Sequence, residues 1–399
     1  MKKIKLSTLG CKVNQYDTQS IRERFLGKGY QEIFNGNGAD ICLINTCTVT
    51  AAADAKSRNL VRNAIKENPF ARIIVTGCMV KETTEPLLNI RGIDYIIPKS
   101  FFNDGITGFS GHTRAFLKIQ DGCNNFCSYC KVPLVRGRSQ SRALSGIVCE
   151  AQKLVKNGYR EIVLCGICLG AYGRDLKPKK NLVAALRELE KIKGLLRIRL
   201  SSIEAGDVSQ ELIDAIADSQ KICRHLHIPI QSGADIILKK MNRRYSRKKY
   251  SRLVKHIKRS IPGAAITTDV LVGFPGESEA HFNNTIDLVK EIEPLRVHVF
   301  PYSARTGTLA SKLSGAVSPD VVKKRVRCAK NLAEQCSRSF RKKFLGKSEA
   351  VLFENRVNGS DSSWQGYTDN YIKVRMRSSA NLENIIRRVR LDEALLALA

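Results

Sequence analysis

Short apolar runs alternate with amphipathic stretches over the first hundred residues. The runs at 5–9, 40–44 and 72–76 have the length and composition of strands. The stretches at 18–27 and 51–67 have the composition of helices, and the second stops just before Pro69. A further short strand is expected between residues 90 and 113, followed by a connector rich in Gly, Ser and Asn. This alternation predicts an α/β domain with a parallel sheet over residues 1–112.

The alternation continues from residue 113 as strand–loop–helix units. Strands are expected at 114–120, 161–164, 197–200, 225–228, 265–272 and 296–300, and helices at 146–157, 182–193, 209–219, 246–260, 278–291 and 319–341. Six consecutive units predict a partial (β/α) barrel over residues 113–340, with its site at the C-terminal ends of the strands.

The last sixty residues have a different pattern, with turn signals that include residues 358–360. Short strands near 349–354, 363–367, 372–377 and 385–391 predict a small antiparallel barrel over residues 341–399. Its aromatic residues Trp364, Tyr367 and Tyr371 either stack on unpaired bases or fill the core. Its basic residues can contact phosphates and are Arg356, Lys373, Arg375, Arg377, Arg387 and Arg388.

Composition narrows the class of protein. A net charge of +30 in 399 residues indicates a polyanionic partner, and nucleic acid is favoured because the charge recurs in separate segments. No apolar run approaches the ~18 residues of a membrane span, and the N-terminus lacks the apolar core of a secretion signal. The 13 cysteines are therefore expected to be thiols and metal ligands in a reducing cytoplasm.

One loop concentrates the chemistry. Cys123, Cys127 and Cys130 form a C-x3-C-x2-C array directly after the first predicted strand of the partial barrel. Three thiolates can hold three irons of a 4Fe-4S cube and leave the fourth open to chelate a small molecule. A structural zinc site needs four ligands in two pairs, and no second pair of His or Cys residues follows at the spacing of a zinc finger. Three unrelated core thiols remain the other alternative. With Tyr129 before its last cysteine, the array resembles the signature loop of radical S-adenosylmethionine (SAM) enzymes.

A second set of cysteines shares a topological position. Cys11, Cys47 and Cys78 each follow a predicted strand of the first domain by one to three residues. The carboxyl ends of parallel strands meet at one rim, so these thiols are expected to converge there. The residues alone leave open whether they hold a second iron–sulfur cluster or are incidental. Cys42 lies inside its strand and is interpreted as a core thiol.

Polar segments with glycines follow the later strands of the predicted barrel, at 165–166, 201–204, 229–233, 273–277 and 301–305. Glycine permits close approach of backbone to a cofactor, and Ser, Gln and Glu can bond its ribose or amino-acid end. Turn chemistry explains each segment equally well when it is taken alone. The candidate SAM-binding residues are Tyr129, Ser202, Glu204, Gln231, Gly273 and Phe274.

Over essentially its whole length the chain resembles the methylthiotransferases of the radical SAM superfamily. The matching segments are T-L-G-C-K-V-N-Q-Y-D, N-T-C-T-V-T, V-T-G-C, L-K-I-Q-D-G-C-N-N-F-C-S-Y-C, V-R-G-R-S-Q-S-R, R-L-S-S-I-E, H-I-P-I-Q-S-G, D-V-L-V-G-F-P-G-E and P-Y-S-A-R-T-G-T. The chain is most similar to the branch that methylthiolates N6-threonylcarbamoyladenosine in tRNA. The branch markers are K-V-N-Q-Y-D, the whole cysteine loop and G-Y-T-D-N-Y-I near the C-terminus.

The resemblance implies cofactors, partners and a third domain of the RNA-binding TRAM type. It implies that Cys123, Cys127 and Cys130 hold the 4Fe-4S cluster that binds SAM. It also implies that an auxiliary 4Fe-4S cluster is held by Cys11, Cys47 and Cys78. The expected partners are the tRNA anticodon stem-loop and an electron donor such as flavodoxin or ferredoxin, and no membrane is expected.

Two cysteines depart from the family pattern. Relatives usually carry other residues at the positions of Cys165 and Cys168. The two cysteines of this chain could be a redox pair, extra metal ligands or small buried thiols. The remaining cysteines are interpreted as structural and are Cys149, Cys223, Cys328 and Cys336.

The implied reaction is methylthiolation of C2 of N6-threonylcarbamoyladenosine next to the anticodon. That C2–H bond has no acidic proton, so acid–base catalysis cannot open it and a radical is required. Isopentenylated tRNA adenosine and a ribosomal-protein aspartate are alternative substrates. A non-catalytic iron–sulfur RNA-binding regulator is the alternative from another class.

Overall fold

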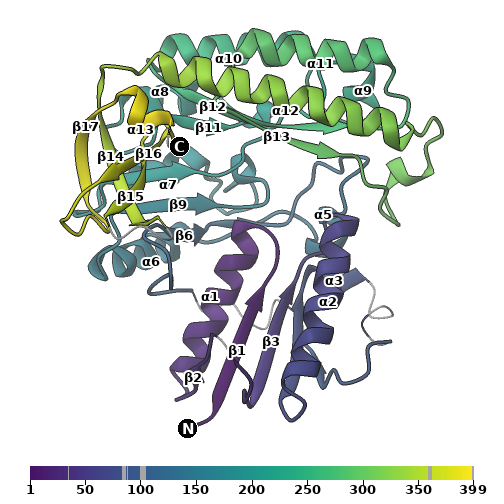
Figure 1. Cartoon of the computed structure of the whole chain (residues 1–399), viewed down its shortest axis with the longest axis vertical. Coiled ribbons are helices and arrows are strands. Elements are labelled where there is room, and N and C mark those ends of the chain that lie inside the picture. Colours follow the sequence, from purple (N-terminus) through teal and green to yellow (C-terminus); the bar gives the residue numbers. More distant parts are fainter. Residues whose placement is uncertain (35, 83–86, 88, 99–104, 358–361, 398–399) are drawn as a thin grey trace.

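The computed structural model of the chain describes residues 1–34, 36–82, 87, 89–98, 105–357 and 362–397 (Figure 1). Residues 99–104 of the predicted connector and the predicted turn at 358–360 lie outside the described residues. No helix in the described part of the chain has both the length and the hydrophobicity needed to cross a membrane.

The N-terminal region is a parallel five-stranded sheet in the order β2-β1-β3-β4-β5. Its strands are β1 (Lys3–Thr8), β2 (Gln31–Glu32), β3 (Ile41–Thr46), β4 (Arg72–Gly77) and β5 (Tyr95–Ile96). The helices are α1 (Lys12–Leu26), α2 (Ala51–Glu67) and α3 (Cys78–Glu82). The predicted α/β architecture is confirmed, with β2 as the strand that the pattern did not reveal.

Helix α1 begins at Lys12, well before the predicted start at residue 18. The polar residues of its first turns are buried because they have partners. Asn14 donates to the carbonyl oxygens of Leu9 (2.6 Å) and Thr46 (3.0 Å). Asp17 pairs with Lys118 of the barrel at 2.5 Å. Since burial here depends on polar contacts, apolar periodicity could not locate the start of this helix.

The central region is the predicted partial barrel. The parallel sheets β10-β9-β6 and β11-β12-β13 are joined by a bridge between Ser202 and His227, so six strands run in one curved row. Figure 1 shows α10, α11 and α12 along one side of β11, β12 and β13. The strands are β6 (Ala115–Lys118), β9 (Glu161–Cys165), β10 (Arg197–Leu200), β11 (His225–His227), β12 (Ala265–Val272) and β13 (Arg296–Pro301). The outer helices are α6 (Leu144–Lys156), α7 (Leu182–Glu190), α8 (Gln210–Asp218), α10 (Arg247–Ser260), α11 (Glu279–Ile292) and α12 (Pro319–Lys342).

Several short elements of the barrel were absent from the prediction, because they are too short to show a period. Strands β7 (Gln120–Asp121) and β8 (Gln140–Ser141) pair antiparallel and flank the cysteine loop. The added helices are α5 (Val132–Arg136) and α9 (Asp235–Lys240).

The C-terminal region is a curled antiparallel sheet in the order β16-β15-β14-β17, consistent with a half-barrel of the TRAM type (Figure 1). Its elements are β14 (Ser348–Arg356), β15 (Ser363–Thr368), β16 (Lys373–Arg377), β17 (Ile386–Arg390) and the short helix α13 (Glu393–Ala397). Trp364 is buried in its core with Phe353 and Val374, so this aromatic fills the core. Tyr367 and Tyr371 instead stack on each other at 5.1 Å, beside arginines of the barrel.

The three regions are packed together through polar contacts. Tyr16 of α1 lies in the same hydrophobic cluster as the barrel core, and its hydroxyl donates to Glu150 at 2.7 Å. At the other side of the barrel, Arg199 donates to the carbonyl oxygens of Thr368 (3.0 Å) and Asp369 (2.9 Å) in the C-terminal sheet. Both outer regions are therefore fixed against the barrel.

The interpretation of the remaining cysteines as structural needs one correction. Cys42, Cys223 and Cys336 are buried, as expected for core thiols. Cys149 and Cys328 are exposed, because they lie on faces of α6 and α12 that point to solvent, and they fill no core.

Candidate active site

The cysteine array lies on the loop between β7 and α5, where Cys123, Cys127 and Cys130 are all half-buried. The backbone N–H of Asn125 donates to Cys123 Sγ at 3.4 Å, and Arg243 Nη1 donates to Cys127 Sγ at 3.3 Å. Hydrogen bonds to sulfur favour the thiolate and are a feature of iron–sulfur sites. This set of three thiols with N–H donors fits a cluster held by three cysteines.

The loop is fixed in place by its backbone. Ser128 donates from its backbone N–H to Met241 (3.0 Å), and its own carbonyl oxygen accepts from the N–H of Ala310 (2.7 Å). Gly122 has a φ of +70°, and an added Cβ would overlap the carbonyl group of Arg138. A residue other than glycine at this position would therefore displace the start of the loop.

Burial and charge set the protonation of these thiols. Burial raises the pKa of Cys130 to about 12 and also raises the pKa of Cys127. A hydrogen bond from Cys168 lowers the pKa of Cys123 to about 7. The nearby Arg243 is itself paired with Glu204 at 2.8 Å. Because metal ligation requires thiolates, a metal that binds here displaces protons from the buried thiols.

Cys11, Cys47 and Cys78 lie at one rim of the N-terminal sheet. Cys11 is the N-cap of α1, Cys47 directly follows β3, and Cys78 begins α3 directly after β4. These cysteines follow β1, β3 and β4, which are neighbours in the sheet, and neighbouring strands are about 4.8 Å apart. Cys47 and Cys78 are buried, whereas Cys11 is exposed.

Gly10 and Asn14 pack closely against the cysteines of this rim. Gly10 has a φ of +109°, and a Cβ added there would lie 3.1 Å from Cys47 Sγ. The side-chain oxygen of Asn14 accepts from Cys78 Sγ at 3.7 Å and from Arg136. The rim therefore has the close packing that three ligands of one cluster would need.

Arg136 connects the two sets of cysteines. It lies at the end of α5, directly after the cysteine loop, and pairs with Asp121 at 2.6 Å. Burial alone would lower its pKa, but Asp121, and next Cys78 and Cys11, raise the pKa well above its usual value. One buried guanidinium thus contacts Asp121, shortly before the cysteine loop, and Asn14 at the N-terminal rim.

A cavity of about 680 Å³ lies between the N-terminal rim and the interior of the partial barrel. Cys11, Cys47 and Cys78 line one wall. Other walls come from all six strands of the barrel, through Phe116, Val163, Leu200, His225, Asp269 and His298. This volume falls in the range of small-molecule sites in proteins.

The predicted SAM-binding residues fall into two groups. Ser202 lines the cavity, and Glu204 lies beside Arg243 at the cysteine loop. Gln231 follows β11 with a φ of +60°, and its backbone pairs with β12.

The second group packs inside the protein. Phe274 is fully buried, and its ring meets Tyr129 edge-to-face at 6.5 Å and Tyr302 at 5.5 Å. Gly273 has a φ of +80° and lies tightly against Val322 of α12. Gly273 and Phe274 are both buried, and Phe274 supports the cysteine loop through the ring of Tyr129.

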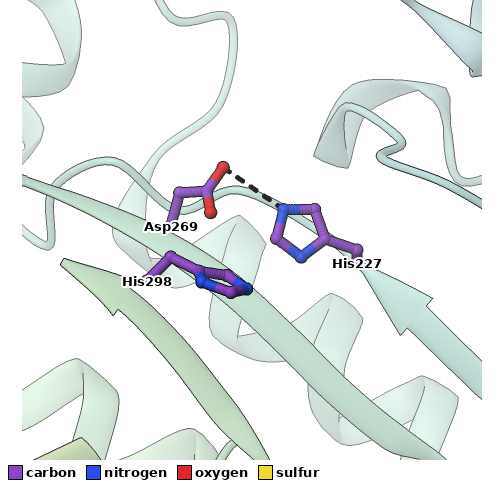
Figure 2. A group of neighbouring side chains, drawn as sticks. All are labelled: His227, Asp269 and His298. Atoms are coloured by element: carbon purple, nitrogen blue, oxygen red, sulfur yellow. Dashed lines mark hydrogen bonds and ion pairs between the residues drawn. The ribbon is translucent and has the colours of Figure 1, made fainter. Parts of the chain in front are cut away.

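Three side chains of the cavity point toward one another from neighbouring strands (Figure 2). His227 Nε2 lies 3.2 Å from Asp269 Oδ2, and His298 is close enough that one ligand atom from each residue lies within 4.8 Å of the others. The ring of His227 also contacts Thr267 Oγ1 at 2.9 Å. Sequence reasoning missed this group, because its members lie on three separate strands and share no motif.

Cys165 and Cys168 are both buried, which agrees with the interpretation as small buried thiols. They lie at different places, however. Cys165 lines the cavity, whereas Cys168 contacts Cys123 and lies 3.6 Å from both Asn125 and Asp207.

Comparison with known proteins agrees with this arrangement. Residues 3–98 match the family described as "Uncharacterized protein family UPF0004", and residues 117–289 match the radical SAM superfamily. The chain is 36% identical to the threonylcarbamoyladenosine tRNA methylthiotransferase MtaB of Bacillus subtilis, over 99% of this chain and 94% of that protein. The protein of the same name from Chlamydia pneumoniae is 38% identical, over 93% and 90%. The chain belongs to the radical SAM methylthiotransferase family.

Other relatives in the family have a different named substrate. A tRNA-2-methylthio-N(6)-dimethylallyladenosine synthase of Clostridium tetani is 35% identical, over 91% of this chain and 88% of that protein. Among solved structures, the radical SAM methyltransferase TsrM of Kitasatospora setae has a TM-score of 0.54 at 14% identity, covering 75% of each chain. That structural likeness supports the fold alone.

Membership of this methylthiotransferase family implies an iron–sulfur cluster and SAM as cofactors. Arg243, Arg136 and Asn14 surround the two sets of cysteines but were not singled out in the sequence. Each is polar and buried through specific partners, so no hydrophobic period marks it.

Proposed function

We propose that this methylthiotransferase adds a methylthio group to C2 of N6-threonylcarbamoyladenosine next to the anticodon in tRNA, using two 4Fe-4S clusters. The observation that carries the proposal is the shared cavity. Its walls include Cys11, Cys47 and Cys78 on one side and the strands of a radical SAM barrel on the other. A base inserted there would be accessible from the N-terminal cysteines and from the barrel.

The two sets of cysteines have separate roles in this proposal. Cys123, Cys127 and Cys130 would hold the SAM-binding cluster, and Cys11, Cys47 and Cys78 the auxiliary cluster. When bound, these groups and SAM would supply the radical that opens the C2–H bond, and the sulfur and methyl group that replace the hydrogen.

The protein side chains position the reactants. Ser202, Glu204, Gln231 and the backbone at Gly273–Phe274 would orient SAM, with Tyr129 of the loop packed against Phe274. The cavity walls exclude water from the reacting carbon. Arg136 keeps the cluster loop and the N-terminal rim in a fixed relation, because it contacts both.

The RNA would be bound along the basic surface of the chain, whose net charge is +30. The three domains would be residues 1–112, 113–340 and 341–399, the last an RNA-binding TRAM-type domain. An unpaired anticodon-loop adenosine would enter the cavity as a flipped base. A cytoplasmic location and a small electron donor such as flavodoxin or ferredoxin complete the proposal.

Two observations separate this function from its rivals. The cavity is lined by five lysine and arginine side chains, which suit an anionic substituent better than an isopentenyl group: Lys12, Arg114, Arg136, Arg199 and Arg296. The named relatives of highest coverage act on threonylcarbamoyladenosine, which also argues against a ribosomal-protein aspartate. A non-catalytic RNA-binding regulator would not need a cavity enclosed between the N-terminal cysteines and a radical SAM barrel.

The test is nucleoside mass spectrometry of tRNA from a strain that lacks the gene. The expected result is loss of the methylthio group from threonylcarbamoyladenosine, with the unthiolated nucleoside in its place. Complementation with the wild-type gene serves as the control. An unchanged nucleoside profile would refute the proposal, and loss of methylthio-isopentenyladenosine instead would reassign the substrate.

A further inference from the structure

The cavity carries two cations without a carboxylate partner among the described residues. They are Lys12, the first residue of α1, and Arg296, the first residue of β13. The other three basic residues of the cavity are paired. Arg114 pairs with Glu354, Arg136 with Asp121 and Arg199 with Glu161.

Position along the strand places Arg296 far from Gly273 and Phe274, two of the predicted SAM-binding residues. Arg296 is opposite Thr267 in β12, whereas Pro301 at the other end of β13 is opposite Val272, directly before Gly273. Five residues of extended strand span about 17 Å. Because side chains alternate along a strand, Arg296 shares its face with His298 and Phe300, and all three line the cavity.

The C-terminal sheet completes this end of the cavity with Tyr371. Its ring lies 5.6 Å from the Arg296 guanidinium and 4.6 Å from that of Arg199. Burial alone would raise the pKa of Tyr371, but Arg114, Arg199 and Lys12 lower it. The O–H of Tyr371 is able to donate to an anion.

The neighbouring imidazoles are consistent with an anion rather than a metal cation. Burial lowers the pKa of His298; Asp269 opposes this, while His227, Arg296 and Lys12 lower it further. The group of His227, Asp269 and His298 therefore lies in cationic surroundings, which disfavour a divalent metal ion. A neutral His298 can hydrogen-bond a polar substituent of a base.

We infer that Arg296, with Lys12 and Tyr371 beside it, binds the carboxylate of the N6 substituent and thereby selects a carboxylate-bearing adenosine. This inference rests on the proposed function, since it concerns the substrate of the same site. A planar guanidinium is well suited to a carboxylate, because two N–H groups can donate to its two oxygens. An isopentenyl group would leave the partly buried Arg296 against apolar atoms, at a cost to binding.

A phosphate of the RNA backbone is the other anion that these cations could bind, and the experiment separates the two. Three anticodon stem-loops are compared that differ at one nucleotide: threonylcarbamoyladenosine, its carboxyl methyl ester and unmodified adenosine. Dissociation constants and kcat/KM are measured for the wild type, Arg296→Gln and Arg296→Lys. Arg187→Gln, which removes an exposed charge on α7, is the control for lost net charge.

The wild type is expected to prefer the free carboxylate over the ester by about 10- to 100-fold, the value of a charge-assisted hydrogen bond. Arg296→Gln is expected to lose most of that preference, Arg296→Lys to keep part of it, and Arg187→Gln to keep all of it. Equal weakening on all three RNAs would assign Arg296 to a phosphate and overturn the inference. A wild type that does not distinguish acid from ester would also overturn it, whether or not the variants fold. Failure of the proposed function looks different, because the wild type would then methylthiolate none of these RNAs.

Discussion

Replacement of Glu161 tests how the C-terminal sheet is held against the barrel. This carboxylate is fully buried on β9 and accepts from Arg199 at 2.7 Å, with Arg197 at 3.6 Å and Arg114 at 3.7 Å. Arg199 also donates to the carbonyl oxygen of Thr368 in the C-terminal sheet. One anion thus lies close to three guanidinium groups at the contact between the two regions, and only Arg114 also pairs with Glu354 among those three.

The change Glu161→Gln keeps the shape of the side chain and removes the charge. Removal of one partner from a buried ion pair costs about 3–5 kcal/mol, because the remaining charges are left uncompensated. Glu211 offers a matched control, because its pair with Arg187 is exposed (47% and 65%). Glu211→Gln is expected to cost about 1 kcal/mol or less.

The assay is urea unfolding followed by tryptophan fluorescence. Trp364 is the single tryptophan of the chain and is buried in the core of the C-terminal sheet, so its emission reports on that region. Glu161→Gln is expected to lower the midpoint by about 1 M or more. A midpoint no lower than that of Glu211→Gln would show that the arginines do not depend on this carboxylate.

The same residue predicts a pH dependence. Burial alone would raise the pKa of Glu161, but Arg199 and Arg114 outweigh it and hold the pKa below its usual value. A group with a lowered pKa in the folded state stabilises it above the unfolded value, near pH 4.3 for Glu, and this contribution is lost as the pH falls further. The difference between wild type and Glu161→Gln should therefore be constant near neutrality and shrink only below about pH 4. A difference that already shrinks between pH 8 and 6 would contradict this.

The remaining predictions concern the two sets of cysteines. Cys123→Ala is expected to abolish SAM cleavage, whereas Cys47→Ala keeps cleavage and blocks thiolation; equal loss of 5′-deoxyadenosine in both variants, measured by chromatography, would refute the division of roles. Gly122→Ala should lower the iron content of a chain that also carries Cys47→Ala, because the added Cβ overlaps backbone; full iron content would contradict this. Arg243→Gln removes a charged donor to Cys127, so the potential of the SAM-binding cluster in a redox titration should become more negative, and an unchanged potential would argue that the hydrogen bond does not persist in the loaded enzyme.

The sequence located the long elements well because their patterns are local. The bounds of α2 and of the strands β10 and β12 agree with the prediction, since each buries a continuous or periodic apolar face. Placement of Cys11, Cys47 and Cys78 at one rim followed from the parallel topology alone. Contacts between regions could not be predicted in the same way. The local hydrophobic pattern does not reveal that Asp17 pairs with Lys118, a contact that accompanies the early start of α1. It does not reveal the position of Arg296 either.

The side chain of Arg136 has a consequence for protein engineering. Its guanidinium is bonded to Asp121 beside the cysteine loop and to Asn14 at the N-terminal rim, so it is one of the contacts that set the distance between the two sets of thiols. A chimera that takes its first hundred residues from a distant relative could fold in both halves and still misalign them at this junction. Such a hybrid would keep both sets of thiols but would change where they lie relative to each other.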